Sequence, residues 1–296
     1  MSPERAYRLN AGEPLPEGIV LIALGRIDHA IGELRGGADS GAEEAVHEVR
    51  KDVKKLRALL RMTRGELGDD TFRRENSCFR DAGRELSGVR DSDAMLETLR
   101  TLELPAGMER GLRGTIQAHR ALGDRDGRDA AAADVVAMLR EARERVNDWP
   151  LERDSFDALR DGLERTYRGG RRDFRAARTK PTVETLHEWR KRVKELWYHH
   201  TLLRALWPPV MQAVGDEAHE LANRLGDDHD LAMLAEWVRE HPEVEPEFFA
   251  ILDVRRSELQ GEAMVIGRRL YSDKPSAYVR RLGLLWEASQ ASVRAP

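Results

Sequence analysis

One basic segment occurs twice in this chain, and this repeat constrains the fold more than any other feature. The first copy reads HEVRKDVKKLRALLRM over residues 47–62, and the second reads HEWRKRVKELWYHHTLL over residues 187–203. At an offset of 140, the matched positions are His47/His187, Arg50/Arg190, Lys51/Lys191, Val53/Val193, Lys54/Lys194 and Leu56/Leu196. A second match follows each copy: Leu86, Arg90 and Asp91 align with Leu225, His229 and Asp230 at an offset of 139. Two separated matches at nearly one offset predict a duplicated unit.

Apolar side chains spaced three and four residues apart run through most of the chain, which predicts an all-α fold. The pattern and the Gly- and Pro-containing breaks place helices over 16–36, 42–65, 69–102, 106–122, 130–147, 151–179, 181–207, 209–240, 246–270 and 274–291. After an N-terminal segment at 1–15, we expect one helical repeat over 16–147 and a second over 151–291. The repeats are expected to pack as two bundles about a pseudo-twofold axis.

Composition narrows the class of protein. With 296 residues, 34% charged and only 6% aromatic side chains, the chain suits long amphipathic helices better than a β-sandwich. A single cysteine, Cys78, excludes an intrachain disulfide and favours a reducing compartment. The N-terminal residues form no signal peptide and no apolar run reaches the length of a membrane span, so we expect a soluble cytoplasmic protein.

The formal net charge of −4 conceals segments of strong local charge. Residues 47–64 carry seven Lys and Arg against Glu48 and Asp52, and residues 168–178 carry five Arg against Asp173. Residues 216–247 carry eleven Asp and Glu against two Arg. The sign of local charge indicates the kind of partner better than the total does, so the basic segments favour an anionic ligand.

Each copy of the repeated helix has a cationic side and an apolar side. In the first copy, the cationic side carries His47, Arg50, Lys51, Lys54 and Arg61, and the opposite side carries Val46, Val49, Val53, Leu56 and Leu60. In the second copy, the corresponding sides carry His187, Arg190, Lys191, Lys194 and Tyr198, and Leu186, Trp189, Val193 and Leu196. The polarity of the helix is therefore the same in both copies.

A helix face exposed to solvent normally alternates the sign of its charges. Here like charges stack at i and i+4, as Arg50 with Lys54, Lys51 with Lys55, and Arg57 with Arg61. The three pairs together cost roughly 1 kcal/mol. A polyanion lying on this side would offset that cost, so we interpret it as a binding surface.

Further arginines extend the basic character. Arg168, Arg171, Arg175 and Arg178 follow the spacing of one helix face, with Arg172 beside them and Gly169–Gly170 permitting close backbone approach. Arg80 and Arg84 form an i,i+4 pair that aligns with His219 and Asn223. The guanidinium fork can hold two phosphate oxygens at once, which suits these positions to phosphate.

Together the two His-x-x-Arg-Lys-x-x-Lys segments and the Arg-Asp and His-Asp segments that follow them resemble the CHAD domain, the conserved histidine α-helical domain. The resemblance covers residues 16–291 and implies two pseudo-symmetric four-helix bundles around a basic cavity that binds inorganic polyphosphate, often at polyphosphate granules. Carried over by position, it implies as anion ligands His47, Arg50, Lys51, Lys54, Arg57, Arg61, Arg80, Arg84, Arg90, Arg168, Arg171, Arg172, Arg175, His187, Arg190, Lys191, Lys194, Tyr198, His219 and His229. Glu195 and Trp197 replace the cations Lys55 and Arg57, so the second copy is expected to bind more weakly.

Two alternatives to non-catalytic polyphosphate binding remain open from the sequence. His229–Asp230 is the kind of pair that ligates metal in helical phosphohydrolases, although further ligands are not evident at a recognisable spacing. The second alternative is binding of a nucleic-acid backbone without regard to the bases, although the cationic side of the first copy lacks the aromatic side chains that stack on bases. We expect no enzymatic activity, no cofactor and no metal.

Overall fold

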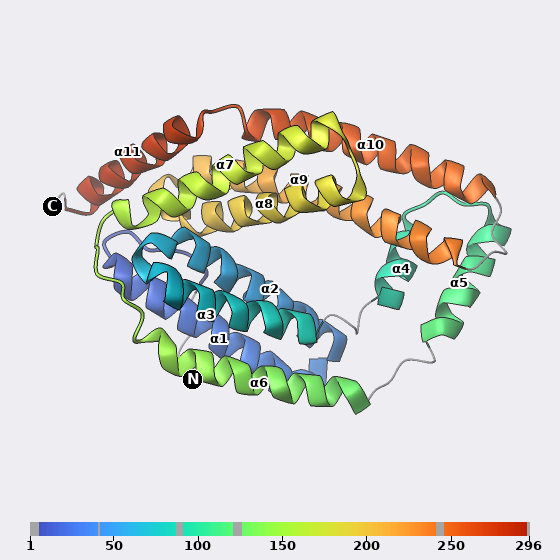
Figure 1. Ribbon diagram of the computed structural model, residues 1–296, viewed down its shortest axis with the longest axis horizontal. Coiled ribbons are helices and arrows are strands. Elements are labelled where there is room, and N and C mark those ends of the chain that lie inside the picture. Colours follow the sequence, from blue (N-terminus) through green and yellow to red (C-terminus); the bar gives the residue numbers. More distant parts are fainter. Residues whose placement is uncertain (1–5, 41, 87–90, 121–125, 241–245, 295–296) are drawn as a thin grey trace.

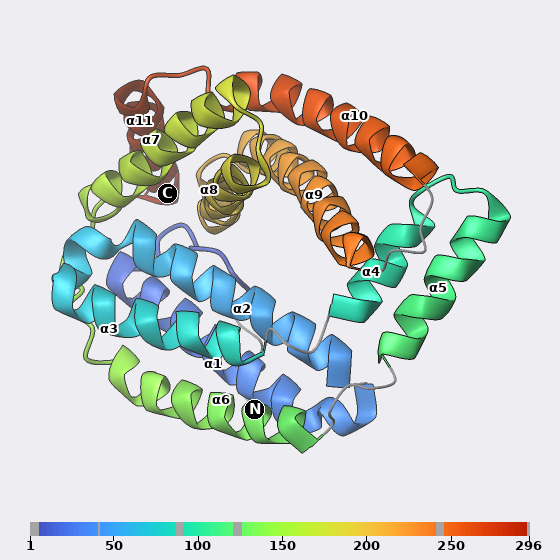
Figure 2. The ribbon, with the colours of Figure 1, turned by 45° about the vertical axis from the view of Figure 1, so that its right-hand side comes forward.

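The computed structural model describes residues 6–40, 42–86, 91–120, 126–240 and 246–294. Within these ranges the secondary structure is helical and contains no strand, which confirms the all-α prediction. The helices are α1 (Leu15–Ser40), α2 (Ala42–Met62), α3 (Arg64–Glu85), α4 (Asp91–Arg100), α5 (Ala106–Arg120), α6 (Asp126–Val146), α7 (Asp157–Thr179), α8 (Val183–Leu202), the 3-10 turn η1 (Arg204–Leu206), α9 (Pro208–Arg239), α10 (Pro246–Leu270) and α11 (Pro275–Arg294). Figures 1 and 2 show them arranged around a central gap between the ribbons.

One group of four helices comes from the first half of the chain. α2 packs between α1 and α3, and α6 closes the group against α1 and α3. The apolar side of α2 lies inside it, with Val49, Val53, Leu56 and Leu60 buried as the sequence predicts. Burial of a stripe at this spacing is the main stabilisation of an amphipathic helix, so the cationic side of α2 has to face away from the group core.

A second group comes from the second half, where α7, α8, α9 and α10 pack in chain order and α11 lies on α7. Its core contains several ring contacts: Tyr167 stacks on Tyr278 with centroids 4.0 Å apart, and the buried Trp189 meets Phe174 at 5.1 Å. The apolar cluster of this group is continuous with that of the first group. The two halves therefore share one core, while the duplication at 16–147 and 151–291 stays a prediction.

The hairpin of α4 and α5 belongs to the first half but packs on the second. Its apolar side chains form a separate cluster with the end of α9 and the start of α10. Positions matched at an offset of 139 or 140 occur on both sides of this cluster, namely Met95/Leu234, Leu96/Ala235, Leu99/Val238, Met108/Phe248 and Leu112/Leu252. In Figure 2 this hairpin connects the two groups at the right-hand side of the molecule.

Several predicted helix boundaries are wrong, each for a local reason. The helix expected over 69–102 is two helices, because α3 ends at Glu85 and α4 begins at Asp91. The segment from Arg64 to Leu67 joins α3 through Gly68, whose φ of 71° interrupts the regular helix. The helix expected from 151 begins at Asp157, because the preceding segment is not helical and its Asp154 Oδ1 accepts the backbone N–H of Leu15 at 2.8 Å.

No helix among the described residues is both long enough and apolar enough to cross a bilayer.

The backbones of the two groups approach each other closely at Gly162 in α7. A β-carbon there would lie 2.6 Å from the carbonyl oxygen of Arg61 and closer still to that of Met62, at the end of α2. Backbone atoms, unlike the end of a flexible side chain, cannot move aside without shifting a helix. Glycine at this position therefore sets the distance between α7 and α2.

We expect Gly162→Ala to lower the free energy of unfolding by about 1–3 kcal/mol, the usual range for overpacking. Gly111→Ala in α5 is the matched control, because a β-carbon there meets no atom within 4 Å. It should instead raise stability by about 0.5–1 kcal/mol, since alanine is the better helix former. Urea unfolding of both variants measures the difference, and equal midpoints would contradict the close approach.

Candidate anion-binding site

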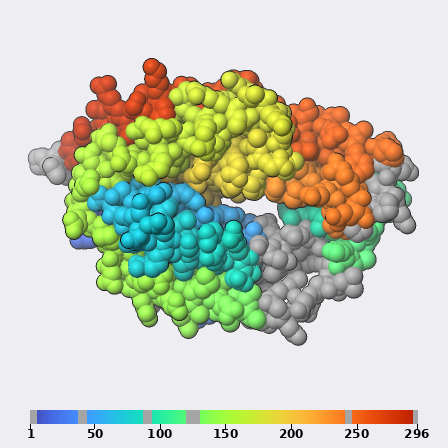
Figure 3. Space-filling view, viewed as in Figure 1, coloured from blue at the N-terminus to red at the C-terminus, as the bar shows by residue number. Residues whose placement is uncertain are grey.

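Helices α2 and α8, which carry the two basic segments, meet near their C-terminal ends. There the Nε2–H of the buried His199 donates to the carbonyl oxygen of Ala58 at 3.0 Å, and Arg61 pairs with Glu195 at 3.2 Å. Towards their N-termini the two helices separate. Figure 3 shows the molecular surface hollowed on this side, between α2 and α3 below and α8 and α9 above. We call this hollow the opening.

The first-copy cations near the N-terminal part of α2 lie on the side of the helix away from its core. Lys54 is exposed, while His47 and Arg50 are half-buried. Arg50 donates from Nη1 to the carbonyl oxygen of Leu86 at 3.3 Å, and Lys51 pairs with Glu48 at 2.6 Å. The structure thus keeps these predicted ligands together on one face.

Two more of the cations predicted to stack against like charges have an acidic partner in the structure. Lys55 pairs with the buried Asp52 at 3.3 Å, and Arg61 pairs with Glu195 from α8. Helical spacing reveals the first pairing, because Asp52 and Lys55 are i,i+3 neighbours on α2, but not the second, because Glu195 comes from a distant helix. Arg61 is therefore committed in part to holding α2 and α8 together.

Asp52 belongs to a buried polar cluster that supports α2 from behind. Arg26 contacts it at 3.3 Å and His29 Nδ1 at 2.5 Å, both from α1. A carboxylate that is only 1% exposed needs such donors, since a buried charge is costly without partners. The cluster fixes the rotation of α2 and so the direction in which its other side faces.

Helix α3 adds cations beside α2, as the sequence predicts for Arg80 and Arg84. Arg57 Nε donates to Asn76 Oδ1 at 3.2 Å, which joins the two helices. Burial, and then the charges of Arg61, Arg80 and Arg84, lower the pKa of Arg57 to about 10. An anion placed here would relieve the repulsion, although Arg80 already pairs with Asp81 at 2.8 Å.

In the second copy, His187 of α8 and His229 of α9 form a pair of rings with centroids 4.6 Å apart. Burial, followed by the charges of His229, Lys191 and Arg190, lowers the pKa of His187, and burial followed by Arg190 lowers that of His229. Both rings are therefore neutral at pH 7. The structure brings these two predicted ligands together with Arg190, and Lys191 pairs with Glu188 on α8.

The remaining aromatic positions of the second copy differ from the prediction. His219 stacks on Trp197 with centroids 3.9 Å apart, at positions that match Arg80 and Arg57 of the first copy. Tyr198, predicted as a ligand, is only 4% exposed and packs edge-on against Tyr7. A stack of rings thus replaces a pair of guanidinium groups, and the weaker binding expected of the second copy stays a prediction.

The arginines of α7 meet α8 on a different side from His187, where Arg172 is close enough to Arg192 and Glu188 to interact with their charges. Phe174 and Asp173 of α7 contact Trp189 and Arg192, which lie on the side of α8 turned away from His187. The other predicted ligands on α7 are placed as follows: Arg168 is exposed and pairs with Glu164, Arg172 pairs with Asp173 at 2.7 Å, Arg171 is half-buried and Arg175 is exposed. The spacing along α7 predicts a shared face correctly, but the packing of that helix turns the face outward.

Two other features of the sequence have different roles from those expected. Gly170 makes room for the ring of Tyr271, not for a ligand, since a β-carbon would lie 2.5 Å from the ring. Arg90, a predicted ligand, lies outside the described residues.

One of the carboxylates next to His229 in the sequence is engaged elsewhere. Asp228 is buried and accepts from Arg256 at 2.9 Å and from Gln260 at 2.8 Å. Among the residues that the structure describes, no three His, Cys, Asp or Glu side chains gather as metal ligands would.

The sequence pattern did not single out Arg192, which pairs with Glu195 at 3.0 Å. The i,i+3 spacing of these two residues on α8 is the signal that predicts the pair.

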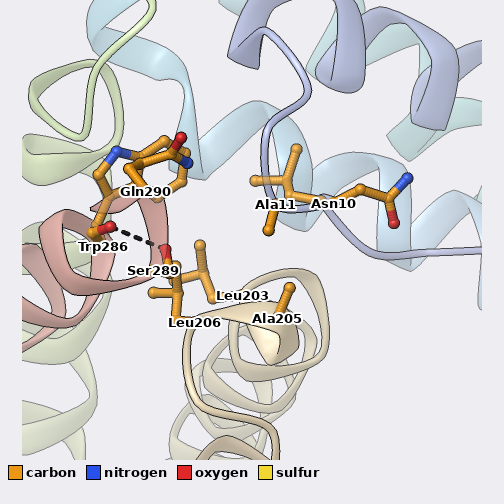
Figure 4. A pocket seen from close by; sticks show the side chains of 9 residues that line it. Asn10, Ala11, Leu203, Ala205, Leu206, Trp286, Ser289 and Gln290 are labelled. Carbon is orange, nitrogen blue, oxygen red and sulfur yellow. Dashed lines mark hydrogen bonds between the residues drawn. The ribbon is translucent and has the colours of Figure 1, made fainter. Parts of the chain in front are cut away.

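An apolar cavity lies at the other end of α8, where the N-terminal segment meets η1 and α11. Figure 4 shows its lining, including Leu203, Leu206 and Trp286. It encloses about 10 Å³, roughly the room that one water molecule needs. The cavity is therefore too small for a ligand, and the cationic faces at the opening are the stronger candidate for a binding site.

Comparison with known proteins assigns the fold to a family. No curated protein gives a significant match to the chain. The crystal structure of the CHAD domain from the plant Ricinus communis matches with a TM-score of 0.64 and 17% sequence identity, over 99% of this chain and 97% of that one. At this identity the likeness concerns the fold. The CHAD domain family itself matches residues 22–239, which is most of the chain, and this protein therefore belongs to the CHAD-domain family.

Proposed function

We propose that this protein binds inorganic polyphosphate along the cationic faces of α2, α3 and α8 and does not cleave it. The observation that carries the proposal is the half-buried position of Arg57 among other guanidinium groups: burial, and then the charges of Arg61, Arg80 and Arg84, lower the pKa of Arg57 to about 10. Crowded, half-buried cations are unfavourable unless an anion joins them. Glu195 and Asp81 offset part of this positive charge, and a polyanion at the opening would offset more of it.

The position of the second copy supports the same ligand. Arg190, Lys191 and Lys194 come from the basic segment of α8, and the neutral His187–His229 pair offers ring N–H donors beside them. Imidazole donates to phosphate oxygens in its neutral form and more strongly when protonated. A long anion lying in the opening would contact both segments.

A chain of bare phosphates fits these faces better than a nucleic acid does. Binding of single strands usually relies on exposed aromatic rings that stack on the bases. Near the opening, Tyr198 is buried and Trp197 is covered by His219. At these two positions near the opening, the rings are thus not available for stacking on bases, whereas the charges and hydrogen-bond donors that phosphate requires are present. We place the protein in the cytoplasm, with polyphosphate granules as the site of its ligand.

Affinity for polyphosphate should fall steeply with salt. The cations of the three faces would neutralise roughly six to nine phosphates, which gives a slope of log K against log salt of about −4 to −6 with the single-strand coefficient. Titration of labelled long-chain polyphosphate at several salt concentrations measures the slope. A slope near −1, or single-stranded DNA competing better at equal phosphate concentration, would contradict the proposal.

Incubation with polyphosphate or nucleoside triphosphates and Mg²⁺ or Mn²⁺ should release no phosphate. We expect no turnover because no three His, Cys, Asp or Glu side chains gather as metal ligands would in the part of the chain that the structure describes. A malachite-green assay measures release. Release that His229→Ala abolishes would instead establish a metal-dependent hydrolase.

Charge reversal on either basic helix should weaken binding of long chains. We expect Lys54→Glu to reduce affinity about tenfold or more, and Lys194→Glu by less, because α2 is joined by the cations of α3. A long chain that contacts both helices gains from effective concentration, whereas a short chain reaches one helix and should respond mainly to one of the two changes. Polyphosphates of defined length, titrated by calorimetry, measure this.

Arg175→Glu is the matched control for charge, because Arg175 is exposed on the outward face of α7. It alters the net charge equally and should change the affinity less than about twofold in physiological salt, since exposed charges are screened beyond about 8 Å. Circular dichroism and melting curves check that all three variants fold. Equal effects of the three substitutions would mean that binding depends on net charge and not on the opening.

A further inference from the structure

Arg190 lies flat against the backbone of α9 at Gly226. A β-carbon on Gly226 would lie 2.5 Å from Nη2 of Arg190, 3.0 Å from Cζ and 3.3 Å from Nε. Gly226 is buried in the middle of α9, where alanine would be the more stable residue for the helix itself. The presence of glycine at this position is therefore explained by the contact with Arg190 and not by helix stability.

The first copy shows why the second needs this glycine. Arg50, which matches Arg190, donates to the carbonyl oxygen of Leu86, the residue that caps the end of α3. Leu225 is the matched position, but α9 continues past it to Arg239. Within a continuous helix the carbonyl of Leu225 accepts the N–H four residues further on. Arg190 consequently cannot end on a helix terminus as Arg50 does, and lies over the bare backbone instead.

This placement determines which groups surround the two histidine rings. From α8, His187 is faced by Arg190, Lys191 and Glu188. From α9, the charges nearest to His229 are Asp228 and Asp230, and from α10 it is Arg256. Among the cations, Arg190 is the largest electrostatic influence on His229, and it acts on both rings. The guanidinium and the rings thus form one group of donors.

We infer that Gly226 is a positioning residue, which holds the Arg190 guanidinium beside His187 and His229 so that the three side chains can contact one anionic group of the ligand. This inference rests on the proposed function for its ligand, and on geometry alone for the placement of Arg190. A β-carbon at 226 would displace the far end of a flexible side chain and no backbone, so the fold is expected to tolerate it.

The placement is tested without any ligand. In Gly226→Ala, Arg190 moves away from the rings, and NMR titration of the imidazole protons should show the pKa of His229 rising, with a smaller rise for His187. Arg190→Ala should give a rise in the same direction. Gly215→Ala on the same helix is the control, because its β-carbon would make an ordinary contact of 3.6 Å with His200. Unchanged titration in Gly226→Ala would overturn the inference, whether or not the protein binds polyphosphate.

The consequence for binding is tested by a double-mutant comparison with long-chain polyphosphate. Gly226→Ala alone should weaken binding by about fivefold to tenfold, the loss expected for one misplaced charged donor. In the Arg190→Ala background the same change should alter affinity by less than about twofold, because Gly226 acts through Arg190. Equal losses in both backgrounds would overturn the inference.

Melting curves show whether a loss of binding in Gly226→Ala comes from unfolding, and the wild-type protein shows whether the placement of Arg190 and the proposed function fail separately. If Gly226→Ala alone unfolds, the Arg190→Ala/Gly226→Ala protein should regain a normal melting curve, since removal of the guanidinium removes the clash. If it does not, β-carbon contact with Arg190 is not the cause and the inference fails. Wild-type protein that shows the titration behaviour but binds no polyphosphate would refute the proposed function and leave the placement of Arg190 standing.

Discussion

The crossing of α2 and α8 sets the geometry on which the opening depends. Glu195 is buried at this crossing and shared by Arg61 of α2 and Arg192 of α8. Removing one partner of such a buried pair costs about 3–5 kcal/mol, because the remaining charge is left uncompensated. His199, whose pKa burial lowers, adds a directional hydrogen bond from its neutral ring to Ala58. Directional polar contacts fix the angle between the two helices, and their N-terminal parts are thereby held apart.

The same contact explains why the two basic helices are unequal in charge. Glu195 occupies the position that matches Lys55, and Trp197 the position that matches Arg57. Glu195 is needed in α8 as the countercharge for Arg61, so that position in the second copy is unavailable for a cation. Trp197 in turn stacks on His219, whereas Arg57 lies near Arg80. The weaker charge of the second copy is thus a consequence of how the copies are joined.

Helical periodicity predicts the all-α class and the two sides of α2 and α8 because each is a property of one helix. It fails where a second helix decides the outcome. Arg168 and Arg175 share a face as predicted, yet the packing of Phe174 on Trp189 turns that face outward. Tyr198 follows the spacing of the cationic side of α8 but is covered by Tyr7, from a segment whose fold the sequence does not indicate. The spacing of residues along a helix contains no information about which neighbour covers them.

The matched arginines Arg50 and Arg190 show how one placement is reached by two different local structures. In the first half, α3 ends, and its capping residue Leu86 offers a carbonyl oxygen to Arg50. In the second half the chain continues as α9, so the carbonyl of Leu225 accepts a hydrogen bond within the helix. Gly226 instead leaves space in which the Arg190 guanidinium lies against the backbone. Both solutions place a guanidinium next to a helix backbone on the side of the opening. The requirement common to the two halves is therefore the position of the charge, and the helix boundaries are free to differ around it.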